Sequence, residues 1–158
     1  MRPQNPLAAY RSGAESTVSK PRIVQLLLDG AVTAIQSAID AFELEDFGRR
    51  METIHNQSMK AGAIVAQLRD ALDLTAGGEF AQRLAGLYHY VGDHVVRGNL
   101  QKDPIPFHEA KRHLQVIQEA WREMLLQSGQ PLPTAGQPSR HGGELPNPAS
   151  AAGFSIQV

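Results

Sequence analysis

Apolar residues recur every three or four positions in four separate stretches of the chain. This spacing places apolar side chains on one face of an α-helix and predicts amphipathic helices that bury that face. The first helix is predicted to run to residue 42, and it begins near Ser19, which can cap a helix, and Pro21, which needs no amide partner there. Its apolar face comprises Val24, Leu27, Ala31, Ile35, Ala38 and Phe42. The side chains that widen this face are Ile23, Leu26 and Leu28.

A second helix is predicted from a capping aspartate, Asp46, to about Leu74. Its apolar positions alternate spacings of three and four residues, which is typical of helices packed at a shallow angle in bundles. These positions are Met51, Ile54, Ser58, Ala61, Val65, Leu68 and Leu72.

Two further helices follow the glycine pair at 77–78, which ends the second pattern. The third is predicted to reach about Asn99, with Phe80, Leu84, Leu87, Val91 and Val95 on one face. A turn is predicted over residues 103–106, because Pro104 and Pro106 cannot continue a helix. The fourth helix is predicted to end at residues 128–129, and its face comprises Ala110, Leu114, Ile117, Trp121, Met124 and Leu125.

The predicted fold is an all-α, antiparallel up-down four-helix bundle over residues 19–128. No segment has the period-two alternation of a strand, and short connections between helices favour antiparallel neighbours. Residues 1–18 are polar and turn-rich, and we expect a mobile N-terminal arm. From Gly129 onward ten of the thirty residues are proline or glycine, which predicts a disordered tail over 129–158.

Composition excludes several classes of function. The chain has no cysteine, so disulfides, thiol nucleophiles and cysteine-ligated metals are ruled out. Fifteen basic and sixteen acidic residues nearly cancel, and no basic cluster favours a nucleic-acid partner. The N-terminal residues lack the apolar stretch of a signal peptide, and no apolar run approaches the roughly 20 residues that span a bilayer. We therefore expect a cytoplasmic protein without membrane insertion.

The histidines do not form a catalytic metal motif. His108 and His113 are five residues apart, as are His89 and His94, which places each pair about 140° apart around a helix. A zinc-protease helix needs histidines four apart, on one face. The chain also has no phosphate-binding loop and no nucleophile elbow. We expect no enzyme activity, no cofactor, no metal and no small-molecule substrate.

A signalling function through His55 stays open as the alternative. Histidine phosphotransfer domains are also four-helix bundles, and they place a lysine three residues and a glycine four residues after the histidine. Here Lys60 is five and Gly62 seven residues after His55, so the lysine faces away from the ring.

Two features suggest apolar surface beyond a single core. Tyr88 and Tyr90 are two residues apart, or about 200° around a helix, so both cannot face the same core. Tyr88 fits the core, and Tyr90 then lies at a bundle edge or in a second apolar groove. Glycines 30, 62, 86, 92 and 98 fall inside predicted helices, where each costs about 1 kcal/mol relative to alanine. Close helix crossing or room for a bound segment would explain them.

Three stretches, taken in order, resemble the flagellin-specific export chaperones of the FliS family. Residues 20–31, KPRIVQLLLDGA, are similar to the family pattern S-P-x-x-L-I-x-x-L-Y-D-G-A. Residues 68–90 contain the family's leucine-aspartate, its glycine pair with glutamate and L-x-x-L-Y-x-Y. Asn99, Asp103 and Trp121 complete the series, and Tyr10 occupies the place of a tyrosine in the family's N-terminal arm. One departure is Leu28, where the family commonly has tyrosine.

The resemblance implies a mechanism and a set of contacts. Such chaperones bind the disordered C-terminal region of flagellin, prevent its premature polymerisation and help to present it to the flagellar type III export gate, and their N-terminal arm can occupy the groove when no client is bound. Asp29 and Gly30 are expected to serve helix packing. The residues expected to contact the client are Tyr10, Ile23, Leu26, Leu27, Leu68, Leu72, Leu87, Tyr88 and Tyr90.

Overall fold

The computed structural model describes residues 19–129, and the expected arm and nearly all of the expected tail lie outside them. Within this range the chain forms helices and no strand, which confirms the all-α prediction. The elements are α2 (Lys20–Asp40), the 3₁₀ turn η1 (Ala41–Glu43), α3 (Phe47–Asp70), α4 (Gly78–Gln101) and α5 (Pro104–Gln127).

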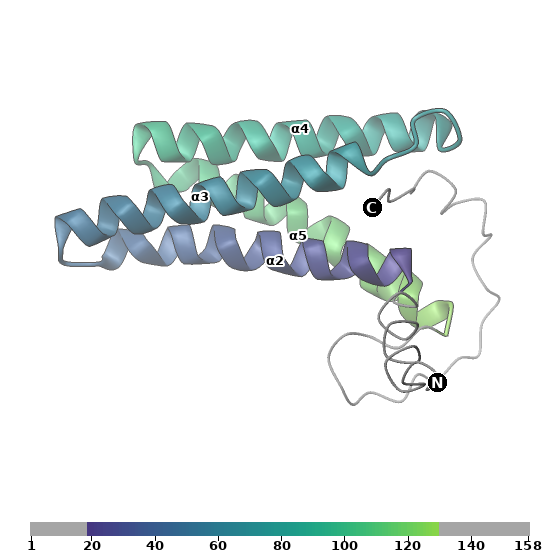
Figure 1. Cartoon of the computed structure of the whole chain (residues 1–158), viewed down its shortest axis with the longest axis horizontal. Helices are drawn as coiled ribbons and strands as arrows, with labels where there is room; N and C mark the ends of the chain where they lie inside the picture. Colours follow the sequence, from purple (N-terminus) through teal and green to yellow (C-terminus); the bar gives the residue numbers. More distant parts are fainter. Residues whose placement is uncertain (1–18, 130–158) are drawn as a thin grey trace, which may run out of the picture.

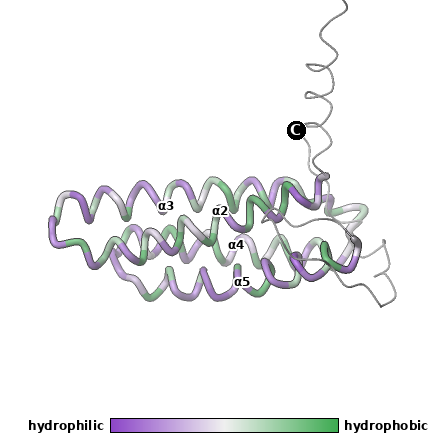
Figure 2. Tube along the Cα trace, turned by 90° about the horizontal axis from the view of Figure 1, so that it is seen from below, coloured by the Kyte–Doolittle hydropathy of each residue, from purple (hydrophilic) through white to green (hydrophobic). Residues whose placement is uncertain are grey.

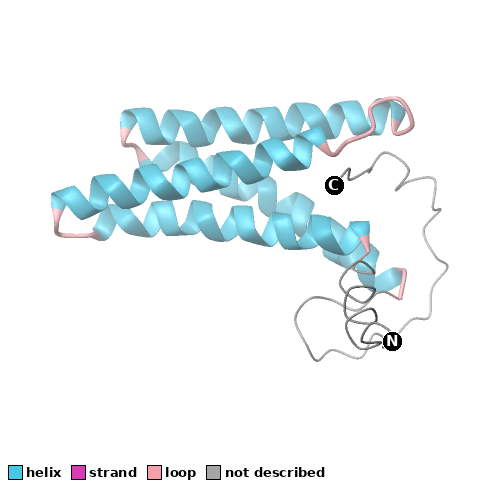
Figure 3. Ribbon diagram, viewed as in Figure 1, coloured by secondary structure: helices cyan, strands magenta, loops and turns pink. Residues whose placement is uncertain are grey.

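Successive helices run antiparallel and form a four-helix bundle (Figures 1 and 3). α2 packs against α3 and α5, and α4 packs against the same two helices, so α2 and α4 lie diagonally across the bundle. The α2–α3 and α4–α5 connections lie at one end, and the α3–α4 connection lies at the other (Figure 1). This arrangement confirms the predicted up-down topology.

The first two helices begin at the predicted caps. The Ser19 hydroxyl accepts a hydrogen bond from the Arg22 amide at 3.4 Å, and the Asp46 carboxylate accepts one from the Arg49 amide at 2.8 Å. These side chains satisfy amides that the first turn of a helix leaves unpaired. α3 ends at Asp70, four residues before the predicted end.

The turn predicted over residues 103–106 is wrong, because α5 begins at Pro104. Proline is tolerated in the first turn of a helix, where its missing N–H would have no partner. The Asp103 side chain caps this helix by accepting from the Ile105 amide at 3.0 Å. The chain reverses at Lys102 instead, which has a left-handed conformation with φ of 51°.

The core contains one stripe from each helix, and hydrophobic and hydrophilic residues alternate along all four (Figure 2). Most predicted positions of α2 and α4 are buried, but on each helix individual positions are displaced by one residue. Leu28 is fully buried, whereas Leu27 is only partly buried against the core. On α4 the prediction of Phe80 as a core residue is wrong: Phe80 is exposed and Ala81 is buried. Neighbouring positions differ by only 100° on a helix, so the apolar pattern alone fits both.

Asp29 joins α2 to α5. One of its carboxylate oxygens accepts from the side-chain amides of Gln25 at 2.8 Å and Gln118 at 2.6 Å, and Arg122 lies 3.4 Å away. Gln25 is fully buried, so its amide needs this internal partner. The expected packing function of Asp29 is confirmed.

One segment of the described residues, Lys20–Glu43, is long and apolar enough to cross a membrane by length and composition. Its side chains at Leu28, Ala31 and Ile35 are completely buried within the bundle. The same apolar character is required of a helix that faces a protein core.

Candidate functional site

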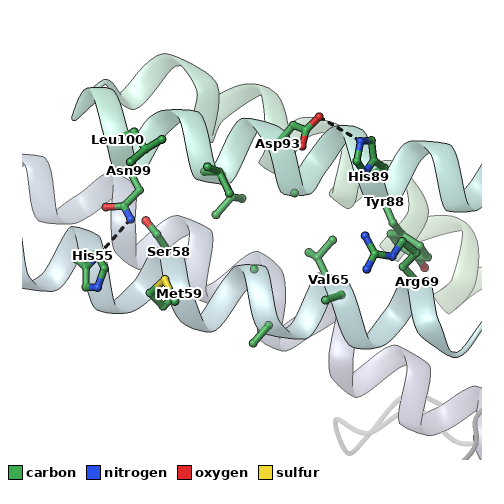
Figure 4. A pocket seen from close by; sticks show the side chains of 16 residues that line it. His55, Ser58, Met59, Val65, Arg69, Tyr88, His89, Asp93, Asn99 and Leu100 are labelled. Carbon is green, nitrogen blue, oxygen red and sulfur yellow. Dashed lines mark hydrogen bonds and ion pairs between the residues drawn. The ribbon is translucent and has the colours of Figure 1, made fainter.

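A groove of about 610 Å³ runs between α3 and α4 (Figure 4). Three large apolar side chains line it and are exposed: Met59 of α3 at 60%, and Val96 and Leu100 of α4 at 55% and 77%. A short apolar groove with exposed side chains is the kind of surface into which an amphipathic helix packs.

Small residues keep the middle of the groove open. Gly62 and Gly92 line it from opposite helices. A Cβ atom added at Gly62 would meet nothing within 4 Å, and one at Gly92 would only touch the Val65 side chain at 4.0 Å. At these two positions glycine therefore leaves open space beside the backbone.

At two other helical glycines, a side chain of a neighbouring helix packs against the backbone. A Cβ at Gly98 would lie 2.7 Å from a ring carbon of the buried Phe107, so glycine permits the close approach of α4 and α5. A Cβ at Gly30 would be in ordinary contact with the Ile64 side chain at 3.5 Å. Gly86 faces open space but does not line the groove.

One end of the groove is closed by a chain of polar contacts that ends at His55 (Figure 4). The Lys102 ammonium donates to Asn99 Oδ1 at 2.6 Å, and Asn99 Nδ2 lies 3.2 Å from His55 Nδ1. An ammonium can only donate, so the Asn99 oxygen accepts and its NH₂ group donates to His55. In this arrangement His55 Nδ1 is the acceptor.

The opposite end carries a cation. Arg69 lines the groove beside Tyr88 (Figure 4), and its guanidinium reaches the neighbouring Asp70 at 3.4 Å. Between the two ends the carboxylate of Asp93 pairs with His89 at 3.4 Å.

Two predicted contact residues, Leu26 and Tyr90, are exposed. Two others, Leu68 and Tyr88, are buried, with exposed fractions of 2% and 1%. Four are partly buried and pack against the core: Ile23, Leu27, Leu72 and Leu87. Tyr10 lies outside the described residues. All nine client contacts stay predictions.

Tyr88 and Tyr90 do not share a surface, as their angular separation predicted. Tyr88 lies at the base of the α3–α4 groove, where burial raises the pKa of its phenol far above the ordinary value. Tyr90 instead contacts His113 of α5, with ring centroids 4.9 Å apart, and its ring lies tilted against that of His94 with centroids 4.0 Å apart. Beside His113, a hydrogen bond from Arg112 lowers the pKa of the partly exposed Glu109.

The sequence interpretation missed Met59, Val96 and Leu100. Val96 and Leu100 are spaced by four residues beside the core stripe of α4, so a second apolar stripe could have been traced from the sequence.

Within residues 19–129 no cluster of three or more histidine or acidic side chains could hold a metal ion.

Residues 3–128 match the family described as "Flagellar protein FliS". Similar proteins named flagellar secretion chaperones include FliS of Bacillus subtilis (strain 168), 24% identical over 122 residues that cover 77% of this chain and 87% of that protein. FliSB of Pseudomonas aeruginosa is 31% identical over 106 residues, 67% of this chain and 81% of that protein. FliS of Escherichia coli (strain K12) is 29% identical over 117 residues, which cover 72% of this chain and 84% of that protein. The family resemblance and the prediction of a chaperone family rather than an enzyme are confirmed.

Proposed function

Because the chain belongs to the flagellar protein FliS family, we propose that it is a cytoplasmic export chaperone that holds the C-terminal region of flagellin. By covering that region it prevents premature polymerisation and delivers the subunit to the flagellar type III export apparatus. The names of the similar proteins support the secretion function. No nucleotide, cofactor or nucleic acid takes part.

The observation that carries the proposal is the open apolar groove between α3 and α4. Met59, Val96 and Leu100 expose apolar surface there. A client segment that becomes helical can lay its apolar face over these side chains and remove both surfaces from water. Tyr88 supports this surface from below.

The groove alone is too small for tight binding. Burying the exposed parts of these three side chains contributes about 3–6 kcal/mol, whereas association costs about 4–15 kcal/mol. The client must therefore cover further surface to reach useful affinity. The exposed Leu26 on α2, with its partly buried neighbours Ile23 and Leu27, offers such surface, and a client that wraps around the bundle would use both.

The alternative, phosphotransfer through His55, gains no support from the family, whose similar members are named chaperones. His55 Nδ1 is also engaged by Asn99 at 3.2 Å.

The test uses glycines that face open space. We expect Gly62→Leu to place a side chain in the groove and to weaken binding of a C-terminal peptide from the same organism's flagellin at least tenfold, measured by calorimetry. Gly86→Leu is the matched control: it adds the same side chain on an exposed turn of α4 outside the groove, and binding should stay within twofold of wild type.

On mixing with the wild-type chaperone the peptide should gain helical circular dichroism. A peptide that neither binds nor changes its spectrum would refute flagellin as the client. Equal binding to both leucine variants would place the client elsewhere on the bundle.

A further inference from the structure

We propose that Arg69 makes the α3–α4 groove selective for client helices that carry a carboxylate at one end of their apolar stripe. This inference rests on the proposed function, since it specifies the client of the same groove. The occupant is an amphipathic helix of another protein, three to four turns long.

The first argument is that Arg69 has unused hydrogen-bonding capacity. Its Nε and one terminal nitrogen both approach a single oxygen of Asp70 at 3.4 Å, and both side chains are substantially exposed. Such a long contact between exposed sequence neighbours contributes little. A guanidinium has five N–H donors in a planar fork that matches both oxygens of a carboxylate. A client carboxylate would therefore be a better partner for the Arg69 guanidinium than Asp70 is.

The second argument is the balance of charge along the groove. The acidic side chain among the lining residues is Asp93, whose carboxylate lies 3.4 Å from His89 Nε2. At the other end the ammonium of Lys102 contacts Asn99. Among the lining residues Arg69 supplies the positive charge at one end and Asp93 the negative charge nearer the middle, so a client carboxylate meets its complementary charge at the Arg69 end.

The third argument is spacing. Arg69 follows Met59 by ten positions in α3, which corresponds to about 15 Å along a helix at roughly 1.5 Å per residue. A client helix lying along α3 covers this length in about ten or eleven residues, or three turns, so the two client positions share one face. The client signature is an apolar residue that meets Met59, further apolar residues one and two turns away, and Asp or Glu at the third turn.

The experiment is a charge reversal with a matched control. Arg69→Glu should weaken binding of the flagellin C-terminal peptide at least tenfold at low salt, with a smaller loss at high salt. Lys60→Glu makes the same charge change at an exposed position of α3 that does not line the groove, and its affinity should stay within twofold of wild type. Thermal denaturation checks that both variants remain folded.

The compensating change identifies the client residue. Replacing each acidic residue of the peptide by lysine in turn should reveal one position that weakens wild-type binding and restores binding to the Arg69→Glu variant. If Arg69→Glu binds like wild type while Gly62→Leu still blocks, the inference falls and the proposed function stands. If the wild-type protein is a dimer and Arg69→Glu dissociates it, the groove holds a second copy of this chain. That result would also overturn the inference.

Discussion

Glycine has opposite uses at two positions of this bundle. At Gly98 the missing side chain lets α4 approach the Phe107 ring, while at Gly62 it leaves space that no part of residues 19–129 fills. Both positions lie inside helices, and each carries the same loss of helix propensity, about 1 kcal/mol. The first use stabilises the fold and the second keeps a surface open, so the two glycines should respond differently to alanine.

We expect Gly98→Ala to destabilise the bundle by about 1–3 kcal/mol, because its methyl group would lie 2.7 Å from a ring carbon of the fully buried Phe107. Gly62→Ala should stabilise it by up to about 1 kcal/mol, since its methyl group meets nothing within 4 Å. Urea denaturation followed by circular dichroism measures both changes. Equal destabilisation by the two substitutions would contradict this assignment.

At the scale of elements, periodicity predicts the helices well and their exposed faces poorly. Four apolar stripes gave four helices because each helix must bury one face, and caps such as Ser19 and Asp46 marked two starts. On α4, Phe80 was assigned to the core because it is larger and more apolar than Ala81, although Ala81 is the one that packs inward. Exposure of Met59 depends on where α4 lies relative to α3, and this distance is not encoded in the pattern of either helix.

The contact between α2 and α5 should depend on Asp29. Asp29→Ala removes the acceptor shared by Gln25 and Gln118, and the buried Gln25 amide loses its partner. We expect a loss of about 1–3 kcal/mol in the free energy of unfolding. Asp40→Ala is the control, because Asp40 also accepts from a glutamine four residues earlier, at 2.6 Å, but on an exposed surface. Its effect should stay within about 0.5 kcal/mol, and a similar loss from both variants would argue against a special packing function of Asp29.

At the scale of the whole molecule, the exposed apolar side chains lie on more than one face of the bundle. Met59 belongs to the α3–α4 groove, Leu26 projects from α2 outside that groove, and Tyr90 lies against α5. A compact client could contact one of these faces at a time. An extended client that becomes helical in segments could contact several and would add their contributions along one chain.

Wrapping by a single client therefore predicts additive losses at separate faces. Leu26→Asp and Met59→Asp should each weaken binding of the full flagellin C-terminal region, because each places a charge where an apolar contact is buried. Since the two side chains do not share the groove, their free-energy changes should add to within about 0.5 kcal/mol in the double variant. A peptide short enough to fill only the groove should lose affinity for Met59→Asp and be indifferent to Leu26→Asp. Calorimetry with both peptides distinguishes a client that wraps over several faces from one that binds only the groove. If Leu26→Asp leaves the affinity for the full C-terminal region unchanged, the client does not extend over α2. The groove must then act together with some other surface.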